Sequence, residues 1–148
     1  MANPSAWKCR ISGQPLTPIV DFGLQPLGNG FLSPDQFEKE YFFHMQVGFD
    51  AESKMLQLLD QPNPEQMFHE NYAFFSGTSR FMAQHFEAFV EQVKASGFLK
   101  DNPFVVELGC NDGILLRHFA KEGIRHLGIE PSINVAAVAN QQGVSTIS

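Results

Sequence analysis

The pattern of apolar and polar positions predicts a strand, loop, helix and strand in the last third of the chain. Phe104–Leu108 is a short apolar run with the length and β-branched content of a buried parallel strand. Apolar side chains then recur at helical spacing from Ile114 to Phe119, and Gly123 ends that helix. A second apolar run ends at Glu130. This order predicts the start of a parallel βαβ fold.

Further elements are predicted before this unit. Tyr41–Phe49 alternates apolar and polar residues, and residues 54–59 return after a polar turn, which predicts an antiparallel hairpin. Residues 1–35 are rich in Pro and Gly, so strands in that stretch are expected to be short. An apolar stripe at helical spacing predicts a long helix over residues 79–96.

Together these elements predict an α+β fold in three parts. Residues 1–62 form a small β-rich unit, and residues 63–103 hold an aromatic connector and the long helix. Residues 104–148 form an incomplete Rossmann-like α/β (βαβαβ) half, with a second helix over 132–142 and a third strand over 144–148. A Pro-rich break sets the first boundary.

The loop after the first parallel strand carries the strongest functional signal. Gly109 and Gly113 are separated by Cys-Asn-Asp, so the dinucleotide pattern G-x-G-x-x-G is absent. The alternation of Glu107, Gly109, Asn111 and Gly113 is similar to the first motif of S-adenosylmethionine (SAM) methyltransferases, with Asn at the middle glycine. Asn tolerates a positive φ, so it can adopt the backbone conformation that the middle glycine of the motif provides.

Two acidic residues are expected to support this loop or to bind SAM beside it. Glu107 can hold the loop or bind the SAM ammonium group. Glu130 lies about 20 residues further on, at the end of the second strand, where an acid accepts hydrogen bonds from both ribose hydroxyls. The alternative is that the glycines only close a tight connection between strand and helix. Pro131 and Ser132, which open another helix, favour the SAM interpretation.

Composition restricts the other possibilities. At 148 residues and 43% hydrophobic content, the chain can bury one modest core, or one small domain and part of another. A net charge of −6 argues against nucleic acid and anionic membrane as partners. The sequence contains no apolar run of membrane-spanning length and no signal-peptide core, so a cytoplasmic location is expected. Cys9 and Cys110 lie far apart and are expected to be free thiols.

The N-terminal unit has the shape of a structural zinc site without its ligands. Such a site takes Cys-x-x-Cys pairs from two turns. Cys9 begins the first turn, but Ser12 stands in its second position, and Asp50 and Ser53 occupy the positions in the hairpin turn. This donor set will not hold zinc at structural affinity, so we expect no metal. The core of the unit is expected to come instead from Phe43, Met45, Phe49 and Leu56.

Other candidate residues carry weaker signals. Tyr72 precedes a helix start together with Phe74 and Phe75, where aromatic side chains either floor a ligand pocket or pack on the core. His85 lies on the apolar side of the long helix, a position more typical of packing than of catalysis. No Ser or Cys is paired with a base in a pattern that indicates nucleophilic catalysis, so the catalytic residues are unknown.

The assembled motifs resemble the SAM-dependent C-methyltransferases of nucleotide-linked deoxysugars, which begin with a small zinc-binding domain. The family motif E-x-G-x-N-D-G-x-L-L matches residues 107–116, and G-I-E-P-S matches residues 128–132. The C-R-x-C-G knuckle is similar to residues 9–13, Q-P-L-x-N to residues 25–29, and Y-x-Y-F-S-S-x-S to residues 72–79. The resemblance covers nearly the whole chain.

The resemblance implies a reaction and a set of binding residues. The reaction is transfer of the SAM methyl group to C3 of a 4-keto sugar joined to a nucleoside diphosphate. Tyr72 and His85 are the implied substrate-binding residues. The implied cofactor-binding residues are Glu107, Gly109, Asn111, Asp112, Gly113, Glu130 and Ser132.

Departures from the family leave two hypotheses open. Three of the four zinc positions lack cysteine, and the family's remaining SAM-domain strands, catalytic segment and C-terminal domain lie beyond Ser148. The chain is expected to be the N-terminal portion of the enzyme, inactive alone and with weak or no SAM affinity. The alternative is a truncated, non-catalytic binding or assembly module. Expected partners are a second copy, a chain supplying the missing half and, once the site is complete, a nucleotide-sugar.

Overall fold

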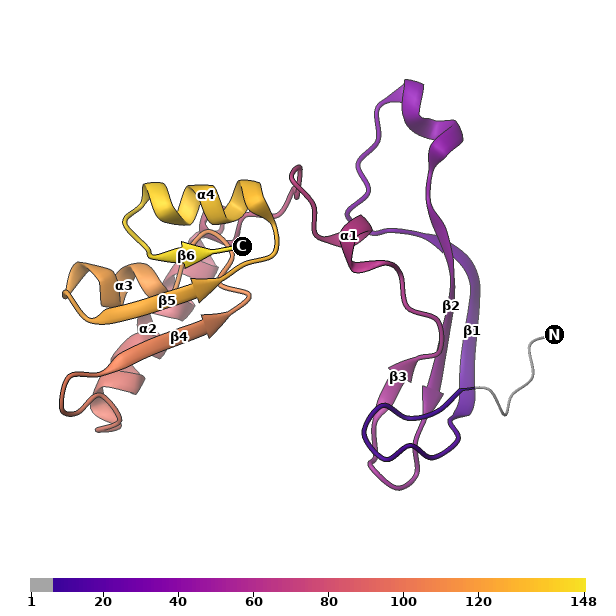
Figure 1. Ribbon diagram of the computed structural model, residues 1–148, viewed down its shortest axis with the longest axis horizontal. Coiled ribbons are helices and arrows are strands. Elements are labelled where there is room, and N and C mark those ends of the chain that lie inside the picture. The colour runs from indigo at the N-terminus through magenta and orange to yellow at the C-terminus, as the bar shows by residue number, and fades with distance from the viewer. Residues whose placement is uncertain (1–6) are drawn as a thin grey trace. The chain divides into compact units, whose positions relative to one another are not determined.

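The computed structural model describes residues 7–148, which belong to two compact units, unit 1 (Met1–Met67) and unit 2 (Phe68–Ser148). Each unit contains its own three-stranded sheet, as Figure 1 shows. The sheet of unit 1 is antiparallel and that of unit 2 is parallel, with helices in both units. The α+β fold class predicted from the sequence is therefore confirmed.

Unit 1 is built on a sheet with the strand order β1-β2-β3. Its strands are β1 (Thr17–Pro26), β2 (Phe42–Phe49) and β3 (Leu56–Leu58). The predicted hairpin is β2 and β3, paired antiparallel with Val47 opposite Leu58. Its alternating sequence places successive side chains on opposite faces of the sheet.

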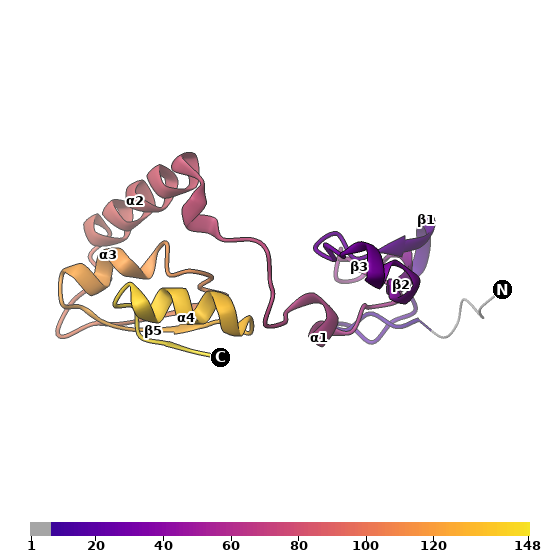
Figure 2. The ribbon, with the colours of Figure 1, turned by 90° about the horizontal axis from the view of Figure 1, so that it is seen from above.

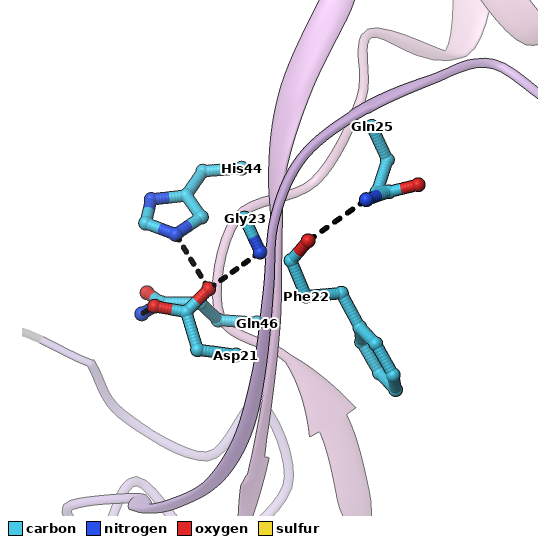
Figure 3. A network of polar contacts seen from close by, with 6 residues as sticks. All are labelled: Asp21, Phe22, Gly23, Gln25, His44 and Gln46. Atoms are coloured by element: carbon cyan, nitrogen blue, oxygen red, sulfur yellow. Dashed lines mark hydrogen bonds and ion pairs between the residues drawn. The ribbon is translucent and has the colours of Figure 1, made fainter.

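Strand β1 corrects the expectation that only short strands occur in residues 1–35, because it is ten residues long. Its pairing with β2 shifts register twice, and the second shift falls between Asp21 and Leu24. At that irregularity Asp21 Oδ1 accepts hydrogen bonds from the Gly23 N–H (2.8 Å) and from His44 Nε2 (2.7 Å), as Figure 3 shows. Bulges and an edge position let a strand carry the Pro and Gly residues that argued against it.

Three short helical segments accompany the sheets. They are the 3₁₀ helix η2 (Pro34–Lys39), the helix α1 (Pro64–Met67) and the 3₁₀ helix η3 (Ser76–Thr78). The predicted long helix is α2 (Arg80–Ala95). The Ser79 hydroxyl accepts a hydrogen bond from the Met82 N–H at the start of α2, which is the usual role of an N-cap serine.

Unit 2 contains the predicted βαβαβ order. Its elements are β4 (Phe104–Leu108), α3 (Leu116–Lys121), β5 (Arg125–Ile129), α4 (Ile133–Gln141) and β6 (Thr146–Ile147). The strand order is β4-β5-β6, and both neighbouring pairs are parallel. Right-handed crossovers between strands in this sequential order place both connecting helices on one face of the sheet.

The core of unit 2 lies under these helices, and Figure 2 shows α3 between α2 and the strands. Its buried members are Val90, Cys110, Leu115, Leu116, Phe119, Ala139 and Val144. No element of residues 68–148 covers the other face of the sheet. Side chains of β4 on that face are exposed, with Phe104 at 55%, Val106 at 48% and Leu108 at 77%. No helix in residues 7–148 is both long and apolar enough to cross a membrane.

Unit 1 buries much less apolar surface than the sequence predicts. The prediction that Leu56 belongs to the core of the hairpin is wrong, because Leu56 is 61% exposed. The other three members are only half-buried. The side chains that are buried in unit 1 include two polar ones, Asp50 and Gln57, beside Cys9 and Leu16.

Candidate functional site

The loop that follows β4 contains three residues with positive φ. These are Gly109 (72°), Asn111 (50°) and Gly113 (76°), the alternation noted in the sequence. Asn is one of the few residues with a side chain that adopts this conformation readily. A Cβ at Gly113 would lie 2.8 Å from Val144 Cγ2, whereas a Cβ at Gly109 would have no described atom within 4 Å. Gly113 is therefore required by packing, while Gly109 borders open space.

Glu130 follows β5 and lies beside this loop. Its side chain is 4% exposed. Oε2 accepts a hydrogen bond from the Asn111 N–H (3.0 Å), and Oε1 accepts one from the Ser132 N–H (2.8 Å). Each carboxylate oxygen has two lone pairs, so both oxygens can accept one more hydrogen bond. Glu130 therefore joins the loop to the start of α4 and retains acceptor capacity.

Glu107 lies one residue before the end of β4. Its Oε2 atom is buried and has no hydrogen-bond partner among the described residues. Burial raises the pKa of Glu107 to about 7. Burial also raises the pKa of the Cys110 thiol, and the negative charges of Glu107 and Glu130 raise it further. A cationic group bound beside these two acids would be stabilised by their charge.

Side chains of the loop also hold the aromatic connector that precedes α2. Asn111 Oδ1 accepts a hydrogen bond from the Ser76 N–H (2.8 Å), and Asn111 Nδ2 donates one to the Phe74 carbonyl (3.0 Å). Asp112 Oδ2 accepts a hydrogen bond from the Gly77 N–H (2.8 Å). A Cβ at Gly77 would lie 2.6 Å from Asp112 Oδ2, so any other residue here would require the Asp112 side chain to move. The connector is thereby fixed alongside the loop.

The two predicted substrate-binding residues have different surroundings. Asn134 Nδ2 donates a hydrogen bond to the Tyr72 carbonyl (2.8 Å), and the Tyr72 ring packs 5.7 Å from that of Phe74, measured between centroids. Tyr72 thus belongs to the connector that the loop holds. His85 is exposed on α2, with its ring edge-on to Phe86 at 5.5 Å. No hydrogen bond in residues 7–148 joins His85 to the loop.

Four buried side-chain oxygens have no partner within the described part of the chain, and all belong to unit 2. They are Glu107 Oε2, Asp112 Oδ1, Ser132 Oγ and Asn134 Oδ1. Three of these residues were predicted from the motif, and Asn134 was missed because nothing in its local sequence distinguishes it. Glu107 lies near the end of β4, Asp112 in the loop, and Ser132 and Asn134 at the start of α4, all next to the carboxyl ends of β4 and β5. Buried polar atoms nearly always have a partner, so this cluster fits a polar ligand.

The four zinc positions of unit 1 also lie together, but as a hydrogen-bonded group. Ser12 Oγ and Ser53 Oγ both donate to Asp50 Oδ2, at 2.6 and 2.5 Å, and Cys9 Sγ lies 3.4 Å from Ser53 Oγ. Structural zinc requires thiolate or imidazole ligands, and here only one thiol is present. Within the described range no three His, Cys, Asp or Glu side chains are grouped so that they could hold a metal ion. The donor set does not fit zinc.

The fold places a small β unit before the start of a parallel α/β sheet, and a glycine-containing loop follows the first strand of that sheet. Residues 9–68 match the family described as “Putative zinc binding domain”. Over 142 residues the chain is 30% identical to the C-methyltransferase NovU from Streptomyces niveus, an alignment that covers 95% of this chain and 34% of that protein. The chain therefore spans about a third of the length of that relative. The expected resemblance to the N-terminal part of the C-methyltransferase family is confirmed.

Proposed function

We propose that this chain is the SAM-binding N-terminal portion of a C-methyltransferase that acts on a nucleotide-linked keto-deoxysugar. The observation that carries the proposal is the position of the Gly109–Gly113 loop at the carboxyl end of β4, with the buried Glu130 bonded to it. Ligands of open α/β sheets bind beyond the carboxyl ends of the strands. The similarity to a C-methyltransferase supports the same reaction class.

The described residues fit the polar groups of SAM. Glu107 faces the ammonium group, because its buried Oε2 has no partner in the described chain. Glu130 binds the ribose hydroxyls with the lone pairs that Asn111 and Ser132 leave free. The open space at Gly109 admits the methionyl part close to the backbone. SAM supplies an electrophilic methyl group, and the residues of this chain bind and orient it.

The sugar is placed on the connector side of this site. Tyr72 lies on the connector, held to α4 by Asn134, and so stands next to the loop that binds SAM. His85, on α2, contacts the same substrate in our proposal, as the family resemblance implies. The family's reaction requires a base to remove the proton beside the ketone. We place that base outside this chain, which therefore does not catalyse methyl transfer alone.

Calorimetric titration with SAM and with S-adenosylhomocysteine tests the proposal. We expect weak binding of both ligands, because a half-formed pocket buries little of its ligand. Glu130→Ala should weaken binding by roughly 1–3 kcal/mol, the cost of hydrogen bonds lost in a desolvated site. Glu38→Ala, which removes an exposed carboxylate of unit 1, is the matched control and should change nothing. Tight binding that Glu130→Ala leaves unaffected would show that the site lies elsewhere.

A second candidate function is that of a non-catalytic assembly module. The observation that favours it is the exposed apolar face of the parallel sheet, with Phe104, Val106 and Leu108. Large exposed apolar patches mark protein contact sites. Complete absence of SAM binding at millimolar concentration, together with a stable complex with another chain, would favour this function over the first.

A further inference from the structure

We propose that a metal-free hydrogen-bond network joins the two turns of unit 1 that a zinc ion joins in a structural zinc site. The network consists of Cys9 and Ser12 from the first turn and Asp50 and Ser53 from the turn between β2 and β3. We call these four residues the polar clasp. The proposal rests on their contacts and burial, and it is independent of whether unit 2 binds SAM.

Asp50 is the centre of the polar clasp. Its side chain is 1% exposed. Oδ2 accepts hydrogen bonds from Ser12 Oγ (2.6 Å), Ser53 Oγ (2.5 Å) and the Ser53 N–H (3.1 Å), and Oδ1 accepts one from the Glu52 N–H (3.1 Å). The hydrogen bonds from Ser12 and Ser53 hold the pKa of Asp50 well below its usual range. A buried carboxylate with this many donors stays ionised and is stabilised by them.

The polarity of the polar clasp is the reverse of that of a zinc site. A zinc site has a central cation surrounded by electron-pair donors. The polar clasp has a central anion surrounded by hydrogen-bond donors, and the donors come from both turns. Serine at two of the cysteine positions and aspartate at a third therefore act together, because the two serines donate hydrogen bonds to the aspartate.

Cys9 closes the network on the side of β3. Its Sγ atom accepts a hydrogen bond from Gln57 Nε2 (2.7 Å) and from the backbone N–H groups of Ile11 (3.4 Å) and Ser12 (3.5 Å). Burial opposes ionisation of the Cys9 thiol, but the hydrogen bonds that its sulfur makes with Ser53, Ser12 and Ile11 outweigh it and lower its pKa. Gln57 Oε1 in turn accepts from the Arg10 N–H (3.1 Å). Each clasp side chain thus has a protein partner, and none is left to bind a metal.

Unit 1 needs such a link because its apolar core is small. Leu16 is buried, but strand residues such as Ile19 (59% exposed) and Phe22 (54% exposed) are not. Domains of this size bury little apolar surface, and many small domains add a metal, a disulfide or another cross-link to their core. The polar clasp and Gln57 supply that link between segments about 40 residues apart in the chain.

The first experiment measures the metal content and the metal dependence of the full chain. Trp7 is the only tryptophan in the sequence and lies in unit 1, where its carbonyl accepts a hydrogen bond from the Leu16 N–H. Its fluorescence therefore follows unfolding of unit 1 alone. We expect less than one zinc per chain and a thermal midpoint that neither EDTA nor added zinc changes. Stoichiometric zinc, whose removal unfolds the unit, would overturn the proposal.

The second experiment removes the clasp hydrogen bonds. Asp50→Asn and the double variant Ser12→Ala/Ser53→Ala should each lower the Trp7 midpoint by about 5 °C or more. Ser33→Ala is the matched control, because Ser33 Oγ also donates to a carboxylate, Asp35 Oδ1 (2.6 Å), but in an exposed site. Clasp variants no less stable than this control would show that the network does not hold unit 1 together.

The third experiment reverses the exchange. The variant Ser12→Cys/Asp50→Cys/Ser53→Cys has cysteine at all four positions. If the polar clasp occupies the position of a zinc ion, this variant should bind one zinc per chain, and EDTA should lower its Trp7 midpoint. Failure to bind zinc would mean that the two turns are not arranged as in a zinc site, which contradicts the proposal.

Discussion

Asn111 has two roles in the SAM-type loop, and a glycine could perform only one of them. Its backbone adopts a φ of 50°, as the motif requires. Its side chain also bonds the carbonyl of Phe74 and the N–H of Ser76. The residue that departs from the general SAM motif therefore also helps to fix the connector, together with Asp112 and Asn134.

Substitution of Asn111 should separate these two roles. Asn111→Gly keeps the backbone conformation and loses the two side-chain hydrogen bonds, so chymotrypsin should cleave the connector after Phe74 or Phe75 several-fold faster. Asn111→Ala should add backbone strain of about 1 kcal/mol at a positive φ and lower the thermal midpoint as well. Cleavage rates equal to those of the wild type in both variants would show that the connector is held by other contacts.

Glu107 should make the stability of unit 2 dependent on pH. Burial raises its pKa from 4.5 to about 7, so the folded state keeps a proton that the unfolded state releases between these values. The unfolding free energy should therefore fall as pH rises from about 4.5 to about 7 and stay level above that. Urea unfolding at several pH values should show this component in the wild type and not in Glu107→Gln. An unchanged pH profile in Glu107→Gln would contradict this assignment.

Among the elements, local sequence patterns predicted unit 2 better than unit 1. The strands β4 and β5 are continuous apolar runs, and Gly109 and Gly123 mark the connections, so spacing alone is informative. Strand β1 contains Pro18, Gly23 and Pro26 and is stabilised by pairing with β2, far away in sequence. Local patterns report neither such pairing nor the bulges that make it possible.

The same limit applies to the candidate site. The loop glycines and Glu130 could be predicted because turn geometry and strand ends fix their spacing. The hydrogen bonds of Asn111, Asp112 and Asn134 to the connector could not, because they join residues that tertiary packing brings together. The polar clasp was missed for the same reason, since its sequence shows only absent ligands.

The packing of the loop on Val144 and on α4 should make Gly113 the more sensitive of the two loop glycines. Gly109→Ala and Gly113→Ala introduce a Cβ at nearly equal positive φ, 72° and 76°. Only the Cβ at Gly113 meets a neighbour, Val144 Cγ2 at 2.8 Å. Urea unfolding should therefore show a loss about 1–3 kcal/mol larger for Gly113→Ala. Equal losses would show that φ, and not packing, determines the cost.

For the whole molecule, the uncovered face of the parallel sheet is the feature with the widest effect. A parallel sheet normally has both faces covered, and its apolar residues point both ways. Here one face packs on helices, while Phe104, Val106 and Leu108 remain exposed on the other. We propose that a second copy, or a chain that carries the complementary half, covers this face.

Light scattering at micromolar concentration tests this association. We expect a dimer or larger species, and Leu108→Lys should shift it toward the monomer, because a charge is costly to bury at an interface. Ile11→Lys, at an exposed apolar position of unit 1 (66% exposed), serves as the control. A monodisperse wild-type monomer would show that the exposed face does not drive assembly.

The polar clasp also affects whether folding of unit 1 depends on the zinc supply and the redox conditions of the cell. A four-cysteine site must bind a zinc ion before it is stable. It cannot do so when zinc is scarce or when oxidants convert its cysteines to disulfides. Unit 1 contains one cysteine, Cys9, and the other groups of the polar clasp are side chains that need no added ion. Under the proposal made for the polar clasp, folding of this unit needs no supply of zinc.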